Sequence, residues 1–188
     1  DLILGQASGT IKYFQHSGSG NILIEKNGTD NPFHAVVAED DYGGCSAPLL
    51  FHLNGDSHLD LIVGSGRGDL LQWINNGNGT FTQISTIELA GTFWTSPTST
   101  DVDGDLLIDL IVGETKGQLM YLRNTGTSSS AQFTLIANDD VNNPFIGINP
   151  GADSKPMAFD VDNDGDDDLI CGSRTGSIAY YERTGNLK

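Results

Sequence analysis

Short apolar runs that end in glycine recur along the chain, and each is followed after a brief turn by a second apolar segment. Runs such as "LIVG" are rich in β-branched residues and too short for a buried helix, so they predict strands covered on both faces. Segments such as "GDLLQWI" and "GSIAYYE" begin at the next glycine and predict the partner strand of a hairpin. No capped amphipathic stretch interrupts this pattern, which therefore predicts an all-β protein with almost no helix.

One pattern of residues occurs four times. In every copy Asp-Leu-Ile is followed by glycine at offset +4 from the aspartate, glycine at +8, Leu or Ile at +10 and glycine at +17. The copies start at Asp1, Asp60, Asp109 and Asp168. Three copies have a proline at offset −12, namely Pro48, Pro97 and Pro156. Repeats of about 50 to 60 residues with up to four strands each are typical of β-propeller blades.

The repeats predict antiparallel sheets of three, four, four and three strands. A third strand such as "FTQISTI" follows each of the first three hairpins, and a further strand such as "PLLFHL" precedes each of the last three copies. The predicted blades span residues 1–45, 46–94, 95–153 and 154–188, the first and last being partial. Because known rings have at least four blades, we predict an arc of about 3.5 blades of a larger propeller. The alternative is a short chain that completes itself by association.

An acidic loop joins the first and second strands of each predicted blade. In "DVDNDGDDD", residues 160–168, oxygens at loop positions one, three and five would converge, and the carbonyl at seven and the carboxylate at nine would close a cage. Ca²⁺ takes six to eight oxygen ligands in flexible geometry, whereas Mg²⁺ needs a smaller octahedron and Zn²⁺ prefers His or Cys. Carboxylates about 4 Å apart repel by roughly 4 kcal/mol at an effective dielectric near 20, so we expect a cation to stabilise the loop.

The acidic loops differ in quality. Loops 101–109 and 160–168 keep all four aspartates, although Leu106 replaces the glycine of position six, which predicts strain. Loop 52–60 has His52 at position one, so we expect this third site to be weak or empty. The predicted ligands are Asp160, Asp162, Asp164, Asp166 and Asp168; Asp101, Asp103, Asp105, Leu107 and Asp109; and Asn54, Asp56, His58 and Asp60. The alternative is a set of solvated Asp-Gly turns without metal.

Composition narrows the classes of function. The 188 residues contain 9 Lys and Arg against 25 Asp and Glu, a formal charge of −16, which argues against a nucleic-acid partner. No apolar run is long enough to span a membrane. Cys171 replaces an apolar residue of the repeat and is predicted to be a small buried side chain, while a disulfide with Cys45 stays open. The triplets that begin at Asn27 and Asn78 are glycosylation acceptors if the protein is secreted.

The segment "DVDNDGDDDLICGSRTGSIAYYERTG" resembles the FG-GAP/VCBS repeat, the calcium-loop blade of integrin α-subunit propellers and of many extracellular proteins. The resemblance covers nearly the whole chain. It implies a β-propeller, often of seven blades, with Ca²⁺ between the first two strands of a blade and ligand recognition at the opposite rim. The chain departs from the family pattern at His52, at Leu106 and in its partial first and last blades.

These features predict a non-catalytic, calcium-stabilised module for adhesion, outside or on the surface of the cell, that recognises carbohydrate or protein ligands. Extracellular sites bind Ca²⁺ with dissociation constants of about 10⁻⁴ to 10⁻³ M. Aromatic residues of the long connections and basic residues of the short turns are the candidate ligand contacts. They are Trp94, Phe93, Tyr42, His34, Arg67, Lys116 and Arg174. For the aromatic residues the alternative is packing between blades, and for the basic residues it is simple solvation.

Two other functions stay open. One is a structural building block of an extracellular filament or appendage, in which the chain meets other copies or further blades of its own. The other is the propeller part of a polysaccharide lyase or a lipase-like enzyme, although the sequence has neither a Gly-x-Ser-x-Gly nor an HExxH motif.

Overall fold

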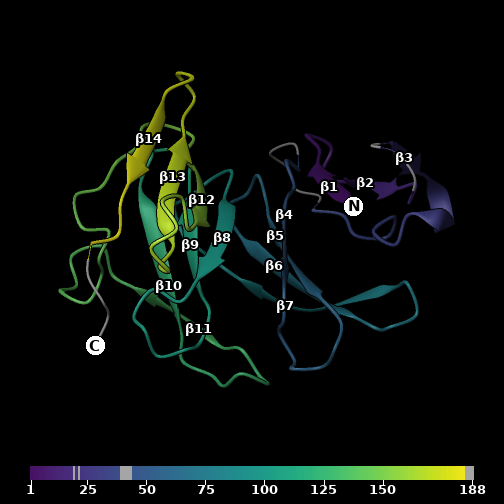
Figure 1. Cartoon of the computed structure of the whole chain (residues 1–188), viewed down its shortest axis with the longest axis horizontal. Coiled ribbons are helices and arrows are strands. Elements are labelled where there is room, and N and C mark those ends of the chain that lie inside the picture. Colours follow the sequence, from purple (N-terminus) through teal and green to yellow (C-terminus); the bar gives the residue numbers. More distant parts are fainter. Residues whose placement is uncertain (19, 21, 39–43, 185–188) are drawn as a thin grey trace. The chain divides into compact units, whose positions relative to one another are not determined.

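The computed structural model describes residues 1–18, 20, 22–38 and 44–184, and its regular structure consists of short antiparallel strands (Figure 1). Among these residues, the one helical element is the 3-10 turn η1, Gly28–Asp30. The prediction of an all-β protein with almost no helix is therefore confirmed. In the part of the chain that the structure describes, no helix has the length and apolar character needed to cross a membrane.

The chain forms two compact units, residues 1–95 and 96–188. Unit 1 holds a three-stranded sheet of β1 (Leu2–Gly5), β2 (Ile11–His16) and β3 (Leu23–Lys26), and a four-stranded sheet of β4 (Ala47–Phe51), β5 (Asp60–Gly64), β6 (Leu70–Asn75) and β7 (Phe81–Ile87). Unit 2 holds a four-stranded sheet of β8 (Ser96–Thr100), β9 (Asp109–Gly113), β10 (Leu119–Asn124) and β11 (Phe133–Ile136), and a three-stranded sheet of β12 (Lys155–Phe159), β13 (Asp168–Gly172) and β14 (Ile178–Tyr181).

Every sheet is antiparallel and keeps its strands in chain order, as propeller blades do. The predicted series of three, four, four and three strands is confirmed. Strands β5 and β9 are buried along their whole length, which their unbroken apolar sequence predicts. Each sheet falls within one of the ranges 1–45, 46–94, 95–153 and 154–188. That these ranges are blades of one larger ring stays a prediction.

The two sheets of unit 1 share one core, and the parity of the repeat offset decides which face a side chain occupies. Successive side chains of a strand point to opposite faces of the sheet. Residues at even offsets from the repeat aspartate therefore lie on one face, and residues at odd offsets lie on the other. The first sheet contributes even offsets to the shared core, and the second sheet contributes odd offsets. The even-offset residues are Ile3, Ile11 and Tyr13, and the odd-offset residues are Leu61, Val63, Leu71 and Trp73.

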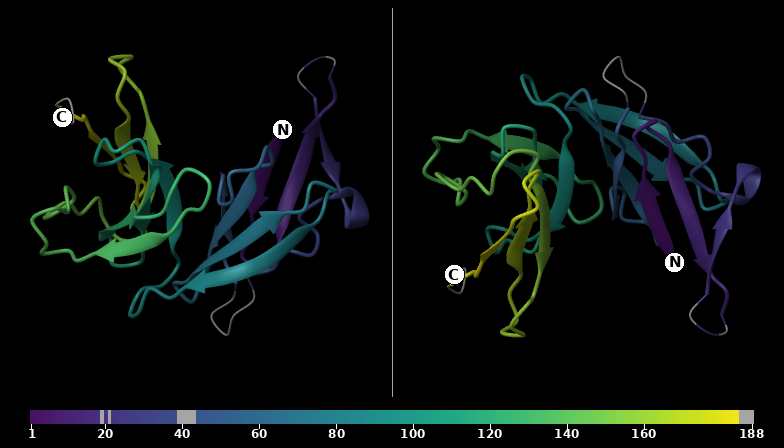
Figure 2. Two further views of the ribbon diagram at one scale, coloured as in Figure 1. Left: turned by 90° about the horizontal axis from the view of Figure 1, so that it is seen from below. Right: turned by 90° about the horizontal axis from the view of Figure 1, so that it is seen from above.

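The two sheets of unit 2 follow the same rule, and Figure 2 shows them from two further sides. Ile111 and Leu119 face the next sheet from even offsets, and the odd offsets of that sheet supply Leu169, Cys171, Ala179 and Tyr181. Cys171 is fully buried, as predicted, and burial raises the pKa of its thiol to about 11. Both cysteines are free.

The connections after β3 and β11 each contain Asn-Pro-Phe. The side-chain oxygen of Asn31 accepts the N–H of Phe33 at 2.9 Å, and Asn143 accepts the N–H of Phe145 at the same distance. Both asparagines are buried, and Phe33 belongs to the core of unit 1. Phe145 packs edge-on against Tyr121, with ring centroids 6.1 Å apart. These connections therefore pack into the core between the two sheets of each unit and are not only surface loops.

A hydroxyl at offset −14, two residues before the repeat proline, closes a clip between the sheets of each unit. In unit 2 the N–H of Ser154 donates to the carbonyl of Glu114 at 3.2 Å, and the N–H of Glu114 donates to Ser154 Oγ at 3.0 Å. In unit 1 Ser46 and Gln6 make the same two bonds, both at 3.0 Å. The motif Ser/Thr-x-Pro is therefore the signature of a joint between consecutive sheets.

Candidate metal centre

The three acidic loops lie where the sequence predicts them, between the first and second strands of three sheets. Two left-handed residues shape the best loops. Position four has φ 78° at Gly104 and 64° at Asn163, and position six has φ 70° at Leu106 and 98° at Gly165. These reversals let alternate side chains turn inward, which is the arrangement that a cation cage requires.

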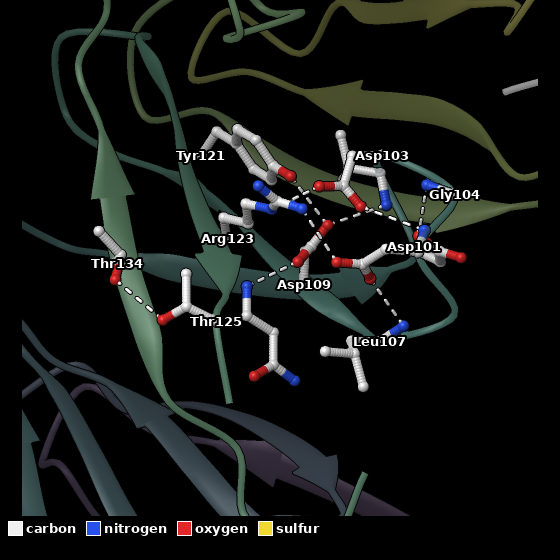
Figure 3. Close-up of polar contacts among 12 residues, drawn as sticks. Asp101, Asp103, Gly104, Leu107, Asp109, Tyr121, Arg123, Thr125 and Thr134 are labelled. Carbon is white, nitrogen blue, oxygen red and sulfur yellow. Dashed lines mark hydrogen bonds and ion pairs between the residues drawn. The ribbon is translucent and has the colours of Figure 1, made fainter. Parts of the chain in front are cut away.

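Loop 101–109 gathers three carboxylates. Asp101, Asp103 and Asp109 each offer a ligand oxygen, and these atoms lie within 4.8 Å of one another (Figure 3). The carboxylate of Asp101 accepts the N–H of Gly104 at 2.7 Å and that of Leu106 at 2.9 Å. The loop backbone therefore fixes the position-one carboxylate at the cage before any ion arrives.

Loop 160–168 also gathers three carboxylates. The group with ligand atoms within 4.8 Å of one another consists of Asp160, Asp162 and Asp164. Asp160 accepts the N–H of Asn163 at 2.6 Å and that of Gly165 at 3.2 Å, which are the bonds that Asp101 makes in the other loop. The two loops thus share the carboxylates of positions one and three, but position nine completes the group in loop 101–109 and position five completes it in loop 160–168.

The carboxylate of Asp166, at position seven of this loop, is poorly satisfied. Its Oδ1 is buried and has no hydrogen-bond partner among the described residues. Burial, followed by the charge on Asp164, raises the pKa of Asp166. This group of carboxylate oxygens, one of which is buried without a hydrogen-bond donor, suits a hard cation such as Ca²⁺. The positive charge of the cation would offset the repulsion among the carboxylates.

The aspartate at position nine has a second task, which the sequence did not reveal. Buried Asp109 accepts the N–H of Val102 at 3.0 Å, the N–H of Asn124 at 2.7 Å and the hydroxyl of Tyr121 at 2.9 Å. The N–H donors at offset +15 in the other copies are His16, Asn75 and Arg183, and the hydroxyl donors at +12 are Tyr13 and Tyr180. Position nine therefore ties the loop to the far end of the next strand.

Two position-nine carboxylates differ in their electrostatics. Burial raises the pKa of Asp109 in spite of its three hydrogen bonds. The pKa of Asp168 is lowered, chiefly by the N–H of Arg183. The hydrogen bond to Asp168 raises the pKa of Tyr180 to about 12. A cation near Asp109 would therefore relieve a desolvation cost that its backbone donors leave uncompensated.

Arg123 reaches into the carboxylates of loop 101–109 from β10 (Figure 3). Its Nε lies 2.5 Å from Asp103 Oδ2, and its Nη2 lies 3.1 Å from Asp105 Oδ2. The Oδ1 atoms of these aspartates accept the N–H groups of Asp105 and Leu107, so both oxygens of each carboxylate are engaged. The guanidinium stands as an internal cation beside two of the predicted ligands.

Loop 52–60 satisfies its polar groups by itself. The His52 ring donates from Nδ1 to the position-seven carbonyl of His58 at 3.1 Å. Asn54 Nδ2 donates to Asp56 Oδ2 at 2.9 Å, and the N–H of His58, the first cause of the lowered pKa of Asp56, donates to Asp56 Oδ1 at 2.7 Å. Asp60 is held by the N–H of Leu53 at 2.8 Å. These bonds engage atoms that a cation would need. The expectation of a weak or empty third site stays a prediction.

Replacing Leu106 with glycine is expected to stabilise the protein by about 0.5 to 1 kcal/mol. The left-handed backbone costs a non-glycine residue about 1 to 2 kcal/mol. The greater freedom of glycine in the unfolded chain offsets about 0.5 to 1 kcal/mol of this gain. The side chain is 86% exposed, so its loss removes little packing. Urea denaturation with EDTA present measures the change. Leu106→Ala is the control, because alanine keeps the strain; equal stability of the two variants would contradict this account.

The basic residues occupy the turns at the opposite ends of the same strands. Arg67 lies between β5 and β6, Lys116 between β9 and β10, and Arg174 between β13 and β14. Arg174 Nε lies 2.5 Å from Asp153 Oδ2, and Arg67 Nε lies 3.8 Å from Asp69 Oδ2. Each of these sheets therefore has an acidic end and an end that carries a basic side chain.

The aromatic candidates are distributed unequally. The N–H of Trp94 donates to the carbonyl of Gly66 at 3.1 Å, which brings Trp94 and its neighbour Phe93 to the turn that carries Arg67. His34 is exposed and its N–H donates to the carbonyl of Asn31 at 3.1 Å. Tyr42 lies outside the described residues.

The sequence analysis did not predict three functional details: the acceptor role of position nine, the clip between sheets and the position of Arg123. The first two have a signal in the sequence. A tyrosine at offset +12 in three copies foretells the acceptor role of position nine, and a hydroxyl at −14 foretells the clip. Arg123 left no signal, because the equivalent residues of the other copies are Gln15, Ile74 and Glu182.

Comparison with known proteins points to one family. Residues 52–112 match the family model described as an FG-GAP-like repeat. The matched stretch includes two acidic loops, 52–60 and 101–109, and ends within β9. A search of curated proteins finds no match.

Proposed function

The chain contains an FG-GAP-like repeat at residues 52–112, and on this premise we propose that it is a calcium-stabilised β-propeller module that recognises carbohydrate or protein ligands outside the cell. The proposal includes the absence of catalysis. The observation that carries it is the pair of half-cages, each of three aspartates with ligand oxygens within 4.8 Å of one another.

Calcium is the cation that these loops favour. Both half-cages consist of carboxylate oxygens, without the His or Cys ligands that Zn²⁺ prefers. Asp105 and the carbonyl of residue 107 would complete the first half-cage, and Asp168 and the carbonyl of residue 166 would complete the second. The flexible coordination of Ca²⁺ tolerates such a crowded shell better than the strict octahedron of Mg²⁺ does.

The end of the sheets opposite the loops supports a recognition role. In unit 1, Trp94 and Phe93 lie beside the turn that carries exposed Arg67. Indole rings stack well on sugar rings or anchor protein partners, and a guanidinium binds carboxylate or sulfate groups in a planar fork. This combination favours an acidic polysaccharide or an acidic protein surface.

The histidines support a non-catalytic role. His16 Nδ1 accepts the N–H of Gly18, and His34 and His52 bond to nearby backbone carbonyls, so these rings are engaged within their own loops. Their distances are 3.1, 2.9 and 3.1 Å, which are ordinary hydrogen bonds. Asn27 and Asn78 are exposed, so both acceptor triplets would be open to glycosylation in the extracellular location that we propose.

Binding to immobilised polygalacturonate and heparin, with neutral dextran as the reference, tests the recognition role. The double variant Trp94→Ala with Arg67→Ala is expected to bind at least about tenfold more weakly than the unmodified protein. Asp56→Ala, at the acidic end, is the matched control and should bind normally. Unchanged binding by the double variant, or release of unsaturated sugar products that absorb near 235 nm, would count against the proposal.

Replacing Arg123 with methionine is expected to raise the affinity of loop 101–109 for Ca²⁺ by about threefold to tenfold. The guanidinium occupies Asp103 and Asp105 and repels a divalent ion, whereas methionine keeps much of the volume without the charge. Tb³⁺ luminescence competed with Ca²⁺ measures the change. Lys12→Met, which removes an ion pair with Glu25 in unit 1, should leave the affinity unaltered; an equal effect of both variants would show that only net charge matters.

A structural building block of an extracellular assembly is the second candidate function. The observation that favours it is the exposure of apolar sheet faces in both units, among them Leu2, Leu4, Met157 and Ile178.

A further inference from the structure

The last sheet of unit 2 has one open apolar face. Ile178, at offset +10 in β14, is 76% exposed, whereas the equivalent Leu119 in β10 is 3% exposed because the next sheet packs on it. Tyr180 is half exposed on the same face. Met157 and Phe159 share this face, because they pair in register with even offsets of β13, and both are more than half exposed. Among the described residues, the even-offset face of this sheet therefore lacks the cover that its counterpart in β8–β11 has.

The first sheet of unit 1 has the complementary open face. Leu4, at offset +3 in β1, is 44% exposed, whereas the equivalent Val63 in β5 is fully buried against the first sheet. Leu2 is similarly exposed, and its partner in register is Phe14. Lys12 stands where the other copies have apolar residues, but its charge is balanced by Glu25 at 2.9 Å. In the part of the chain that the structure describes, this odd-offset face lacks cover.

An even-offset face packs on an odd-offset face in both interfaces that the units contain. We propose that the open even-offset face of the last sheet binds the open odd-offset face of the first sheet in a second copy of this chain. The strand residues of these two interfaces lie mainly on the second and third strands of the repeat, which both three-stranded sheets possess, and the connections that carry Phe33 and Phe145 add further contacts.

A second copy is the occupant because the two open faces are complementary in offset and are carried by one chain. Such an interface is heterologous, joining two different surfaces, so it propagates into a closed ring or a linear assembly. The net charge of −16 opposes it, and salt or bound Ca²⁺ is expected to strengthen it by screening. The proposal goes beyond ligand recognition and does not depend on it.

Sedimentation of two single variants and their mixture tests the proposal. We expect the unmodified protein, with Ca²⁺ present, to associate progressively between about 1 and about 500 µM. Ile178→Asp blocks the even-offset face and Leu4→Asp blocks the odd-offset face, so each alone should weaken association at least about tenfold. In an equimolar mixture, each variant offers the face that the other lacks, and the expected product is a 1:1 dimer without larger species.

Controls distinguish this result from unfolding of the variants and from non-specific hydrophobic association. Val141→Asp changes an apolar residue that is 90% exposed and lies on neither face, so association should be unaltered. Circular dichroism checks the fold of each variant, and Leu2→Asp replaces Leu4→Asp if the latter does not fold. A monomeric unmodified protein over the whole range would overturn the proposal, since the faces would then belong to another partner. Two folded variants that do not dimerise on mixing would overturn it equally.

Discussion

Replacing Asp109 with alanine is expected to lower the free energy of unfolding by about 3 kcal/mol even when EDTA has removed all metal. The substitution leaves two backbone N–H groups and the hydroxyl of Tyr121 without their acceptor. Each abandoned buried donor costs about 1 to 3 kcal/mol, and water entering the vacated space recovers part of that. For a unit of this size the melting temperature should fall by about 10 to 20 °C, which differential scanning calorimetry measures.

Two companion variants test the reason for this loss. Asp109→Asn keeps one oxygen for Asn124 and should lose only about half as much as alanine. Asp105→Ala removes an exposed carboxylate of the same loop and should cost less than about 1 kcal/mol in EDTA. If Asp109→Ala and Asp105→Ala were equally stable in EDTA, position nine would serve only the metal.

Calcium is expected to produce the second large effect, a rise in the melting temperature that chelation reverses. A site in the presence of ligand at 100 times its dissociation constant stabilises the folded state by about 2.7 kcal/mol, so two sites contribute about 5 kcal/mol if they unfold together. Melting curves in about 10 mM CaCl₂ and in EDTA provide the comparison, and MgCl₂ at the same concentration should stabilise the protein much less.

Loop variants locate the effect. Asp162→Ala should remove about half of the calcium-dependent rise, while changing stability in EDTA little, because its one hydrogen bond within the loop is to the N–H of Asp164. Asp56→Ala, in the self-satisfied loop 52–60, should leave the rise intact. Superimposed melting curves of the unmodified protein in calcium and in EDTA would be incompatible with calcium-stabilised loops.

The fold was predictable from the sequence because its determinants are local and repeated. The apolar run from Asp60 to Gly64 and its equivalents define the second strands, and the glycines at fixed offsets define the turns. The position of each acidic loop follows from this order. Strand count and chain-order topology are confirmed for the same reason, since each sheet uses only neighbouring segments.

The details of the site depend on partners that are distant in sequence. Arg183 donates to the carbonyl of Asp101 at 3.1 Å, and Thr100 donates to Asp167 at 2.7 Å, so the two half-cages of unit 2 are braced through residues 67 to 82 positions apart. The spacing of residues within one repeat does not predict contacts between residues of different repeats. The strain at Leu106 was predictable, because it depends only on the residue that occupies a left-handed position.

The double duty of position nine bears on how such repeats can change. Asp60 keeps its backbone partners in the loop where histidine has replaced the leading aspartate, so the hairpin keeps its anchor there. A single substitution of the first aspartate could therefore abolish ion binding in a repeat while the hydrogen bonds that join its strands are kept. The presence of that last acid in a copy is accordingly a guide to architecture, and the first acid is the better guide to whether the copy holds an ion.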